Sequence, residues 1–199
     1  MAFIKTIPAD QSEGKLLEIY QEDLKTKGYV ANHTSAFSLR PEVYQAWQNL
    51  LSSIRSHMRL RRFELVTLAA AQALKCTYCM LAHGSVLRKN FFGPGELAAV
   101  ARDFRSAGLP SEEVALMEFA QKVTLEPNQI GQRDFDLLRE MGLSDEEILD
   151  VVLTVTARNF MSKTLDALGD EPDDVLMGLE PELREALVIG RPFPSRTRG

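Results

Sequence analysis

Apolar side chains recur every three or four residues along most of this chain, which is the period of an amphipathic helix. Glycine, proline and capping residues separate the successive segments; Ser144 and Glu147, for example, form a capping box. No segment alternates apolar and polar residues as a half-buried strand would. The pattern therefore predicts an all-α protein with seven to nine helices. The expected helices cover residues 10–27, 41–54, 60–74, about 75–89 with both cysteines in its opening turn, 94–108, 111–121, 132–141, 144–169 and 181–188.

Length and composition favour a single domain. The 199 residues, 45% of them apolar, suffice for one core and are few for two. We divide the chain into N-terminal helices (10–57), a motif core (60–90), C-terminal helices (94–169) and a proline-containing tail (170–199). Between the first two helices, residues 29–39 are expected to be irregular. After its short helix, the tail is expected to be mobile or packed against a partner.

Charge and hydropathy argue against nucleic-acid and membrane partners. The net charge is −5, and the one basic cluster, formed by Arg55, Arg59, Arg61 and Arg62, is typical of a solvated helix face. Uncharged stretches such as 65–74 are far shorter than the roughly 20 residues that a membrane-spanning helix needs. The first residues lack the pattern of an export signal, so we expect a cytoplasmic protein.

The candidate chemistry lies in Cys76, Cys79 and His83, which include the only two cysteines. On a helix their i,i+3 and i,i+4 spacings put all three side chains on one face. Three interpretations compete: a redox-active pair, a zinc site completed by Glu64 or another histidine, and buried core cysteines. A second pair of zinc ligands is missing, and thioredoxin-like proteins need strands that this chain does not predict. A reducing compartment then favours the redox interpretation.

The residues alone leave the attacking sulfur undecided. Amides at a helix N-terminus lower the pKa of a nearby thiol, which favours Cys76 as the nucleophile. His83 lies one helical turn from Cys79, which favours that thiol instead.

The motif region resembles the AhpD-like alkylhydroperoxidases of the carboxymuconolactone decarboxylase superfamily, in their peroxidase-related branch. The resemblance is carried by Arg61-Arg62-Phe63-Glu64 and, eleven residues later, Cys76-x-x-Cys79-x-x-x-His83. It extends to the flanking segments 28–30, 40–41, 157–160 and 166–169, with Trp47 between them.

The resemblance implies an AhpD-like helical bundle that forms trimers or hexamers and reduces peroxides without a metal or other cofactor. Cys79 would attack the peroxide and Cys76 would resolve the product into a disulfide. Glu64, expected in the first turn of its helix, and His83 would form a proton relay to Cys79 through a water molecule. A dithiol or a protein would regenerate the pair. Tyr78 departs from the pattern, because the best-studied members have histidine there; a phenol is a weaker base and would donate a hydrogen bond or pack.

Two alternatives use the same residues differently. One is a redox sensor or binding module whose disulfide changes an interface, and the other is a lactone decarboxylase, although such enzymes generally lack the cysteine pair. Outside the motif, His57 is expected at a surface or helix end. His33 could line a neighbouring pocket in an oligomer, but we expect it to have no functional role.

Overall fold

The computed structural model describes residues 2–192, and this part of the chain is all-helical with ten α-helices and no strand. Nine of the helices have seven or more residues, as the apolar period predicted. The α-helices are α1 (Gly14–Lys27), α2 (Asn32–Ala36), α3 (Pro41–Arg55), α4 (Leu60–Leu74), α5 (Thr77–Asn90), α6 (Pro94–Asp103), α7 (Ser111–Leu125), α8 (Gln132–Glu140), α9 (Asp145–Leu168) and α10 (Pro181–Leu187). Three short 3₁₀ segments, η1 (Ala9–Gln11), η2 (Pro127–Gln129) and η3 (Asp174–Gly178), join them.

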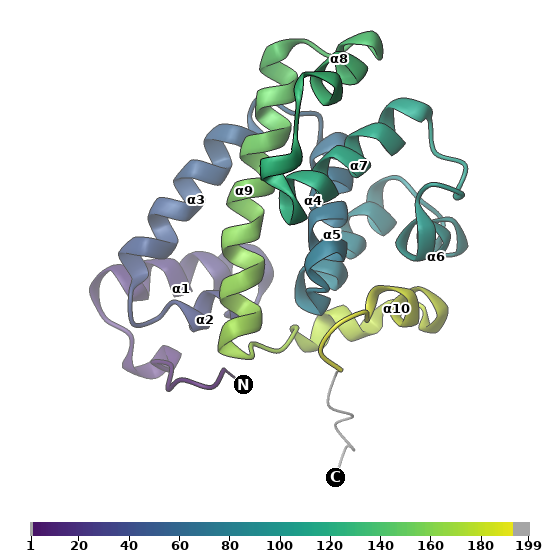
Figure 1. The fold of residues 1–199 in the computed structure, drawn as a ribbon. Helices are drawn as coiled ribbons and strands as arrows, with labels where there is room; N and C mark the ends of the chain where they lie inside the picture. Colours follow the sequence, from purple (N-terminus) through teal and green to yellow (C-terminus); the bar gives the residue numbers. More distant parts are fainter. Residues whose placement is uncertain (1, 193–199) are drawn as a thin grey trace.

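Helix α4 is the centre of the bundle. Every residue from Phe63 to Ala71 is buried, because this stretch is apolar around the whole helix except at Glu64 and Thr67. Helices α5, α7 and α9 pack around it, and α3 packs along the other side of α9 (Figure 1). A polar side chain on this buried surface, such as that of Glu64, must find its partners inside the bundle.

The two arginines of the predicted basic cluster that begin α4 tie it to its neighbours. Arg61 makes a bidentate ion pair with Glu113 of α7, and Arg62 bridges Glu112 of α7 and Glu147 of α9. Their charges are therefore balanced within the bundle.

The predicted helix boundaries hold with local exceptions. Helix α4 begins at Leu60, so Glu64 lies just beyond the first turn in which it was expected. Helix α6 ends at Asp103, earlier than predicted, where the Asp103 carboxylate accepts hydrogen bonds from the Arg105 amide and the Ser106 hydroxyl. Such side-chain bonds to nearby backbone compete with helix continuation.

Residues 29–39 had been expected to be irregular, but they contain the short helix α2. The Asn32 amide, in the first turn of α2, donates to Asp173, which is 141 residues further along the chain. This remote carboxylate satisfies an amide that a local capping side chain would otherwise satisfy. The helix therefore depends on a partner that local sequence does not reveal.

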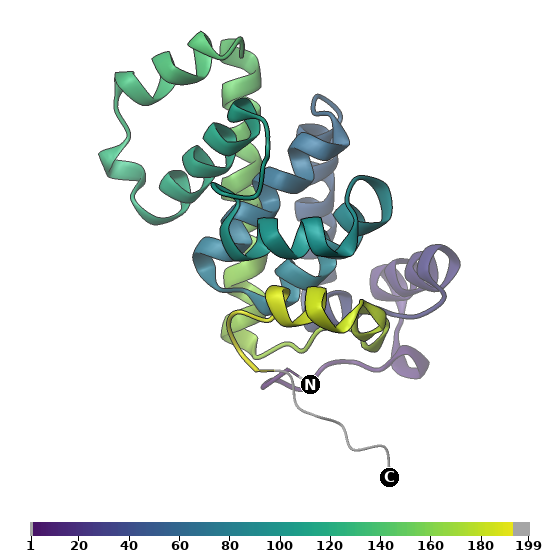
Figure 2. The same cartoon turned by 90° about the vertical axis from the view of Figure 1, so that its right-hand side faces the viewer.

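The short helix predicted near 181–188 is α10, and residues 189–192 after it pack on their own chain. Residues 193–199, which make up most of the tail expected to be mobile or packed against a partner, lie outside the described part. Helix α10 lies against α5 and α6 (Figure 2). Gly84 of α5 leaves room for Leu187, and the Gly190 amide donates to Thr77 Oγ1 at 3.0 Å. The end of the described chain thus covers the start of the motif helix.

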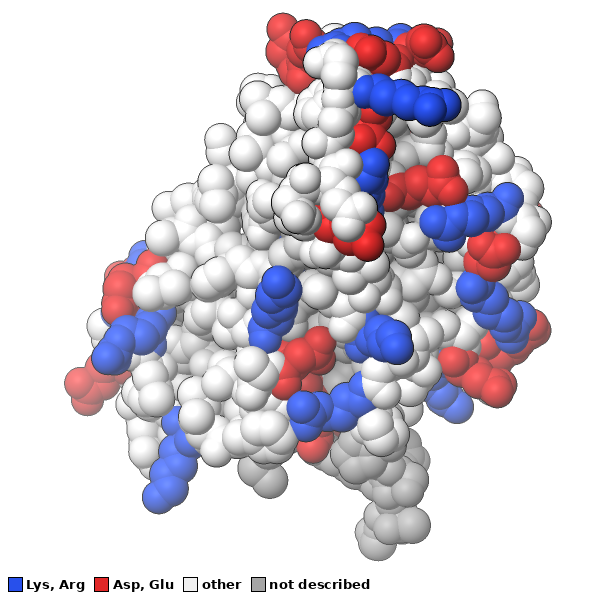
Figure 3. Space-filling view, in the orientation of Figure 1, with Lys and Arg blue, Asp and Glu red and all other residues white. Residues whose placement is uncertain are grey.

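Helix α9 carries apolar side chains on its outer face as well as its inner one. Leu149, Leu153 and Phe160 are exposed there, and Val43 and Leu50 are exposed on α3. Lysine, arginine, aspartate and glutamate are sparse over the upper left of the surface, where these two helices lie (Figure 3). No helix among residues 2–192 combines the length and the hydropathy required to cross a bilayer.

Candidate active site

The two cysteines lie at a sharp turn between α4 and α5. Lys75 ends α4 in the left-handed region at φ 57°, and the Cys76 amide returns to the Ala71 carbonyl at 2.9 Å. Cys76 is the N-cap residue of α5, and Cys79 occupies the third helical position. The turn sets α5 back against α4, so that Glu64 and His83 meet.

A cavity of about 410 Å³ reaches Cys79 and not Cys76. Both thiols are free and buried, but only Cys79 is among the residues that line the cavity. Cys76 lies behind it, with its sulfur 3.8 Å from the Ser162 carbonyl oxygen. A small molecule in the cavity therefore meets the Cys79 sulfur first.

Hydrogen bonds and charge stabilise Cys79 as a thiolate. Ser162 Oγ donates to the Cys79 sulfur at 3.1 Å, and Arg158 Nη2 lies 3.9 Å from it. A hydrogen bond from the Cys76 thiol is the largest influence on Cys79; together with the Arg158 charge it outweighs burial and lowers the pKa of Cys79 to about 5. The same hydrogen bond, followed by burial, raises the pKa of Cys76. The pair thus holds one proton at neutral pH, on Cys76.

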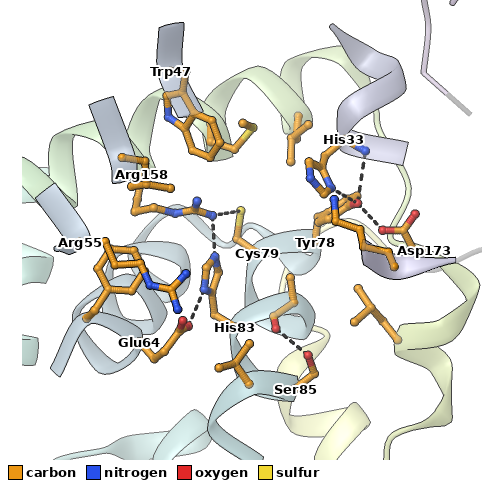
Figure 4. Close-up of a pocket in the computed structure, with 18 of the residues that line it drawn as sticks. His33, Trp47, Arg55, Glu64, Tyr78, Cys79, His83, Ser85, Arg158 and Asp173 are labelled. Atoms are coloured by element: carbon orange, nitrogen blue, oxygen red, sulfur yellow. Dashed lines mark hydrogen bonds and ion pairs between the residues drawn. The ribbon is translucent and has the colours of Figure 1, made fainter. Parts of the chain in front are cut away.

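Arg158 stands between His83 and Cys79. Its Nη2 lies 2.5 Å from His83 Nε2, and His83 Nδ1 lies 2.6 Å from Glu64 Oε2 (Figure 4). A guanidinium only donates hydrogen bonds, so His83 Nε2 must accept. The imidazole is then neutral, with its proton on Nδ1 and donated to Glu64.

This arrangement modifies the expected relay. The structure brings Glu64, Cys79 and His83 into one cluster, but within residues 2–192 no hydrogen bond joins His83 to the Cys79 sulfur. Arg158 makes the link instead. We call this cluster, formed by Glu64, Cys79, His83, Arg158 and Ser162, the thiol end of the pocket.

Sequence reasoning assigned no role to Arg158 or Ser162, although a signal was present. On α9 the buried apolar positions Ile148, Val151 and Val155 continue at helical spacing through Arg158 and Ser162 to Leu165. A charged and a hydroxyl side chain on the buried face of a helix indicate polar partners inside the bundle. The arginine also stacks on an aromatic ring, with its guanidinium carbon 5.4 Å from the Trp47 ring centre.

A second polar cluster lies across the pocket from Arg158. Tyr78 donates to Asp173 Oδ2 at 2.5 Å, and both the backbone amide and the ring Nδ1 of His33 lie within hydrogen-bond distance of the Tyr78 oxygen, at 3.2 and 2.8 Å (Figure 4). We call these three residues the phenol end of the pocket. Tyr78, for which donating and packing were both open, donates.

His33 lines the pocket of its own chain, which corrects the expectation that it occupies a position without a role in the site. Burial, with the nearby charge of Lys27, lowers its pKa to about 3. Burial, and then the Asp173 charge, raises the pKa of Tyr78. His57, by contrast, is exposed just after α3, as predicted.

The described residues contain no group of three or more histidine, cysteine, aspartate or glutamate side chains placed to hold a metal ion. The walls between the two ends are largely aromatic and aliphatic. They include Tyr29, Trp47, Leu51, Phe63, Met161, Leu165 and Leu176. The pocket therefore combines a buried nucleophile with space for an organic molecule.

Comparison with known proteins gives a family match for part of the chain and a common fold for most of it. Residues 41–122 match the model of the carboxymuconolactone decarboxylase family. Searching curated proteins gives no match. The chain is similar in structure to the alkylhydroperoxidase AhpD core of an uncharacterized peroxidase-related protein from Ralstonia eutropha JMP134, with 22% identity, a TM-score of 0.81 and coverage of 88% of this chain and 94% of that one.

Two further solved structures share the fold. An uncharacterized peroxidase-related protein from Silicibacter sp. TM1040 has 21% identity and a TM-score of 0.75, over 88% of this chain and 91% of its own. A variant of the debrominase Bmp8 in complex with 2,3,4-tribromopyrrole has 14% identity and a TM-score of 0.72, over 94% and 98% of the two chains. At these identities the likeness establishes the common all-helical architecture.

Proposed function

We propose that this chain is a thiol-dependent peroxidase of the AhpD-like type, which reduces organic hydroperoxides or hydrogen peroxide. The match of residues 41–122 to the carboxymuconolactone decarboxylase family and the fold shared with peroxidase-related proteins support the proposal. The observation that carries the proposal is the position of Cys79. Its sulfur is the one that the pocket reaches, and its pKa is lowered to about 5 while the neighbouring Cys76 keeps its proton. A nucleophile and a resolving thiol are thus held side by side.

In the first step the Cys79 thiolate attacks the terminal peroxide oxygen. The S–O bond forms as the O–O bond breaks, which oxidises Cys79 to a sulfenic acid and releases an alkoxide or hydroxide. The leaving oxygen takes up one proton, equal to the one released when the thiolate formed. Arg158, which already contacts the thiolate, stabilises the negative charge as it moves to oxygen.

Glu64 and His83 are assigned to the proton exchange that accompanies this step. Their hydrogen bond fixes the imidazole and its proton at the edge of the pocket. A water molecule between this pair and the leaving oxygen completes the transfer. This assignment keeps the predicted proton relay but places the activation of the thiol with Cys76 and Arg158.

In the second step the Cys76 sulfur attacks the Cys79 sulfenic acid. The disulfide forms and water leaves, so one peroxide consumes two thiols and gives one alcohol or water and one water. A cellular dithiol or a protein dithiol then reduces the disulfide. The i,i+3 spacing at the start of α5 keeps the two sulfurs close enough to close the bond with little backbone movement.

Rapid-quench experiments with the two cysteine variants test this assignment. The reduced protein should consume one equivalent of cumene hydroperoxide and lose two thiols. Cys76→Ser should consume one equivalent and stop as a sulfenic acid on Cys79 that dimedone traps, whereas Cys79→Ser should consume none. Peroxide consumption by Cys79→Ser at the parent rate would overturn the assignment of the nucleophile.

Adding a reductant to the oxidised protein separates a catalyst from a sensor. A peroxidase disulfide is reduced again by dihydrolipoamide or a thioredoxin-type reductant and passes through many turnovers. If the parent protein is oxidised once and neither reductant restores its thiols, a redox sensor describes the chain better. Failure of the reduced protein to consume any peroxide would end the peroxidase proposal.

A further inference from the structure

The phenol end of the pocket has a fully determined arrangement of protons. Asp173 accepts from the Tyr78 hydroxyl and from the Asn32 amide. Tyr78 has one proton, which it gives to Asp173, so its oxygen can only accept from His33. Both His33 bonds to that oxygen, from the backbone amide and from ring Nδ1, are therefore donated by His33.

This arrangement leaves His33 Nε2 as an acceptor with a free lone pair. The Nδ1 proton is committed to Tyr78, and the pKa of about 3 keeps a second proton off the ring at neutral pH. Within residues 2–192 no group hydrogen-bonds Nε2, although His33 lines the cavity. Nε2 is not among the fully buried atoms of the described residues, so a ligand donor or a water molecule in the cavity can reach it and satisfy it.

The cationic side chains that line the pocket are already paired within the protein or lie at the edge of the pocket. Lys27 is paired with Asp23 at 2.7 Å, and Arg158 is held by His83 and the Cys79 thiolate. Arg55 is exposed, with its guanidinium carbon 5.6 Å from the Phe63 ring centre. The interior between the two ends is lined by apolar and aromatic side chains, among them Trp47 and Leu51. The pocket therefore suits an uncharged body better than an anion.

We propose that the pocket binds a neutral, largely apolar or aromatic molecule whose hydroxyl or N–H group donates a hydrogen bond to His33 Nε2. Such a molecule spans the cavity from His33 towards Cys79, and its peroxide group lies at the sulfur; this last point rests on the proposed peroxidase function. Tyr78 and Asp173 are positioning residues that act through His33. The substrate class is thus a hydroxylated or N–H-bearing organic hydroperoxide.

Binding to the Cys79→Ser protein tests the proposal without peroxide chemistry. Phenol and its methyl ether, anisole, have the same ring, but only phenol donates a hydrogen bond. Trp47 is the only tryptophan and lines the pocket, so its fluorescence reports binding of either compound, with calorimetry as a second measure. One buried hydrogen bond predicts that phenol binds about three- to tenfold more tightly than anisole.

Two variants locate that preference at His33. His33→Phe, which fills the space but has no acceptor, should bind phenol and anisole equally. Tyr78→Phe frees the Nδ1 proton to move to Nε2. The ratio of the affinity for phenol to that for anisole should then fall towards one. Acetophenone, which only accepts hydrogen bonds, should bind more tightly. Tyr44→Phe is the matched control, because its hydroxyl pairs with Thr34 and it is not among the pocket residues; it should keep the parent ratio.

Several results would overturn the proposal. One is an equal affinity of the parent pocket for phenol and anisole, and another is a ratio that survives both His33→Phe and Tyr78→Phe. Tighter binding of benzoate than of phenol would show that a cation selects the ligand instead. If His33→Phe does not fold, Tyr78→Phe decides the outcome. A peroxidase that shows no phenol preference would refute this inference alone, and a phenol preference without peroxide consumption would refute only the proposed function.

Discussion

The two ends of the pocket treat their titratable groups in opposite ways. At the thiol end, the Cys76 hydrogen bond and the Arg158 charge overcome burial and hold Cys79 as an anion. At the phenol end, burial prevails and keeps His33 neutral. Burial disfavours any charge, so the partners of a group decide whether it ionises. One end therefore supplies a nucleophile and the other a neutral acceptor.

Removing Arg158 should have the largest effect on this contrast. In the parent protein, the rate of alkylation by iodoacetamide should rise through pH 5 and level off above it, because only the thiolate reacts. Arg158→Met removes the positive charge beside the sulfur, so the midpoint should move up by about one pH unit or more. For a shift of one unit, the rate near pH 5 should then fall about fivefold, with little change at pH 8.

Arg55→Met is the matched control, since Arg55 also lines the pocket but makes no hydrogen bond to Cys79 in the described structure. Its midpoint should stay at the parent value. An unchanged midpoint in Arg158→Met would mean that Cys76 and Ser162 alone hold the thiolate.

At the phenol end, Asp173→Asn should lower stability and leave the thiol unchanged. The amide can still accept from Tyr78 through its oxygen, but its NH₂ group cannot accept from the Asn32 amide. One buried backbone donor is left without a partner, so the free energy of unfolding should fall by about 1–2 kcal/mol in urea titrations. A shift in the alkylation midpoint of this variant would show that the two ends are electrostatically coupled.

The smallest effect is expected just beyond the phenol end, at Asp170. Its Oδ2 is buried without a partner, and burial, followed by the charge of Asp173, raises its pKa to about 7. The unfolded chain loses this proton near pH 4, so folding retains it between about pH 4 and 7 and stability falls as pH rises through that window. Asp170→Asn should therefore stabilise the protein by about 1 kcal/mol at pH 8 and have no effect below pH 4.

Thermal or urea unfolding at the two pH values measures this difference. Asp10→Asn, at an exposed position in η1, serves as the control and should be neutral at both. A loss of stability in Asp170→Asn at pH 8 would show that the folded protein uses the charge of this carboxylate.

More of the thiol end than of the phenol end could be predicted from the sequence, and the reasons are physical. Cys79 and His83 lie on one helix, so helical period alone brings them together. Glu64 lies on the preceding helix, beyond a break that helical period does not cross, and the family resemblance is what predicted it. Arg158 lies on a helix distant in sequence, and its position on the buried face of that helix was the only sequence signal for a role in the site. The interhelical contact that inserts it between His83 and Cys79 depends on how α9 packs, which periodicity does not specify.

The phenol end could not be predicted because its members support one another across the chain. Helix α2, which carries His33, has too few residues to be stable by itself, and Asp173 helps to complete its first turn. The fold class, the long helices and the Ser144–Glu147 capping box were predicted correctly. The assembly into trimers or hexamers stays a prediction, for which the exposed apolar row on α9 offers a surface.

The bond between Asn32 and Asp173 also orders events during synthesis. A ribosome releases the chain from its N-terminus, so residue 32 emerges 141 residues before its partner. Until then the phenol end has no carboxylate, and the tail segment that covers the start of α5 is still absent. The nascent chain thus carries its two thiols without the walls that later shield Cys76. The arrangement that buries Cys76 and leaves Cys79 on the pocket wall is therefore complete only after the C-terminal part of the described chain has been made.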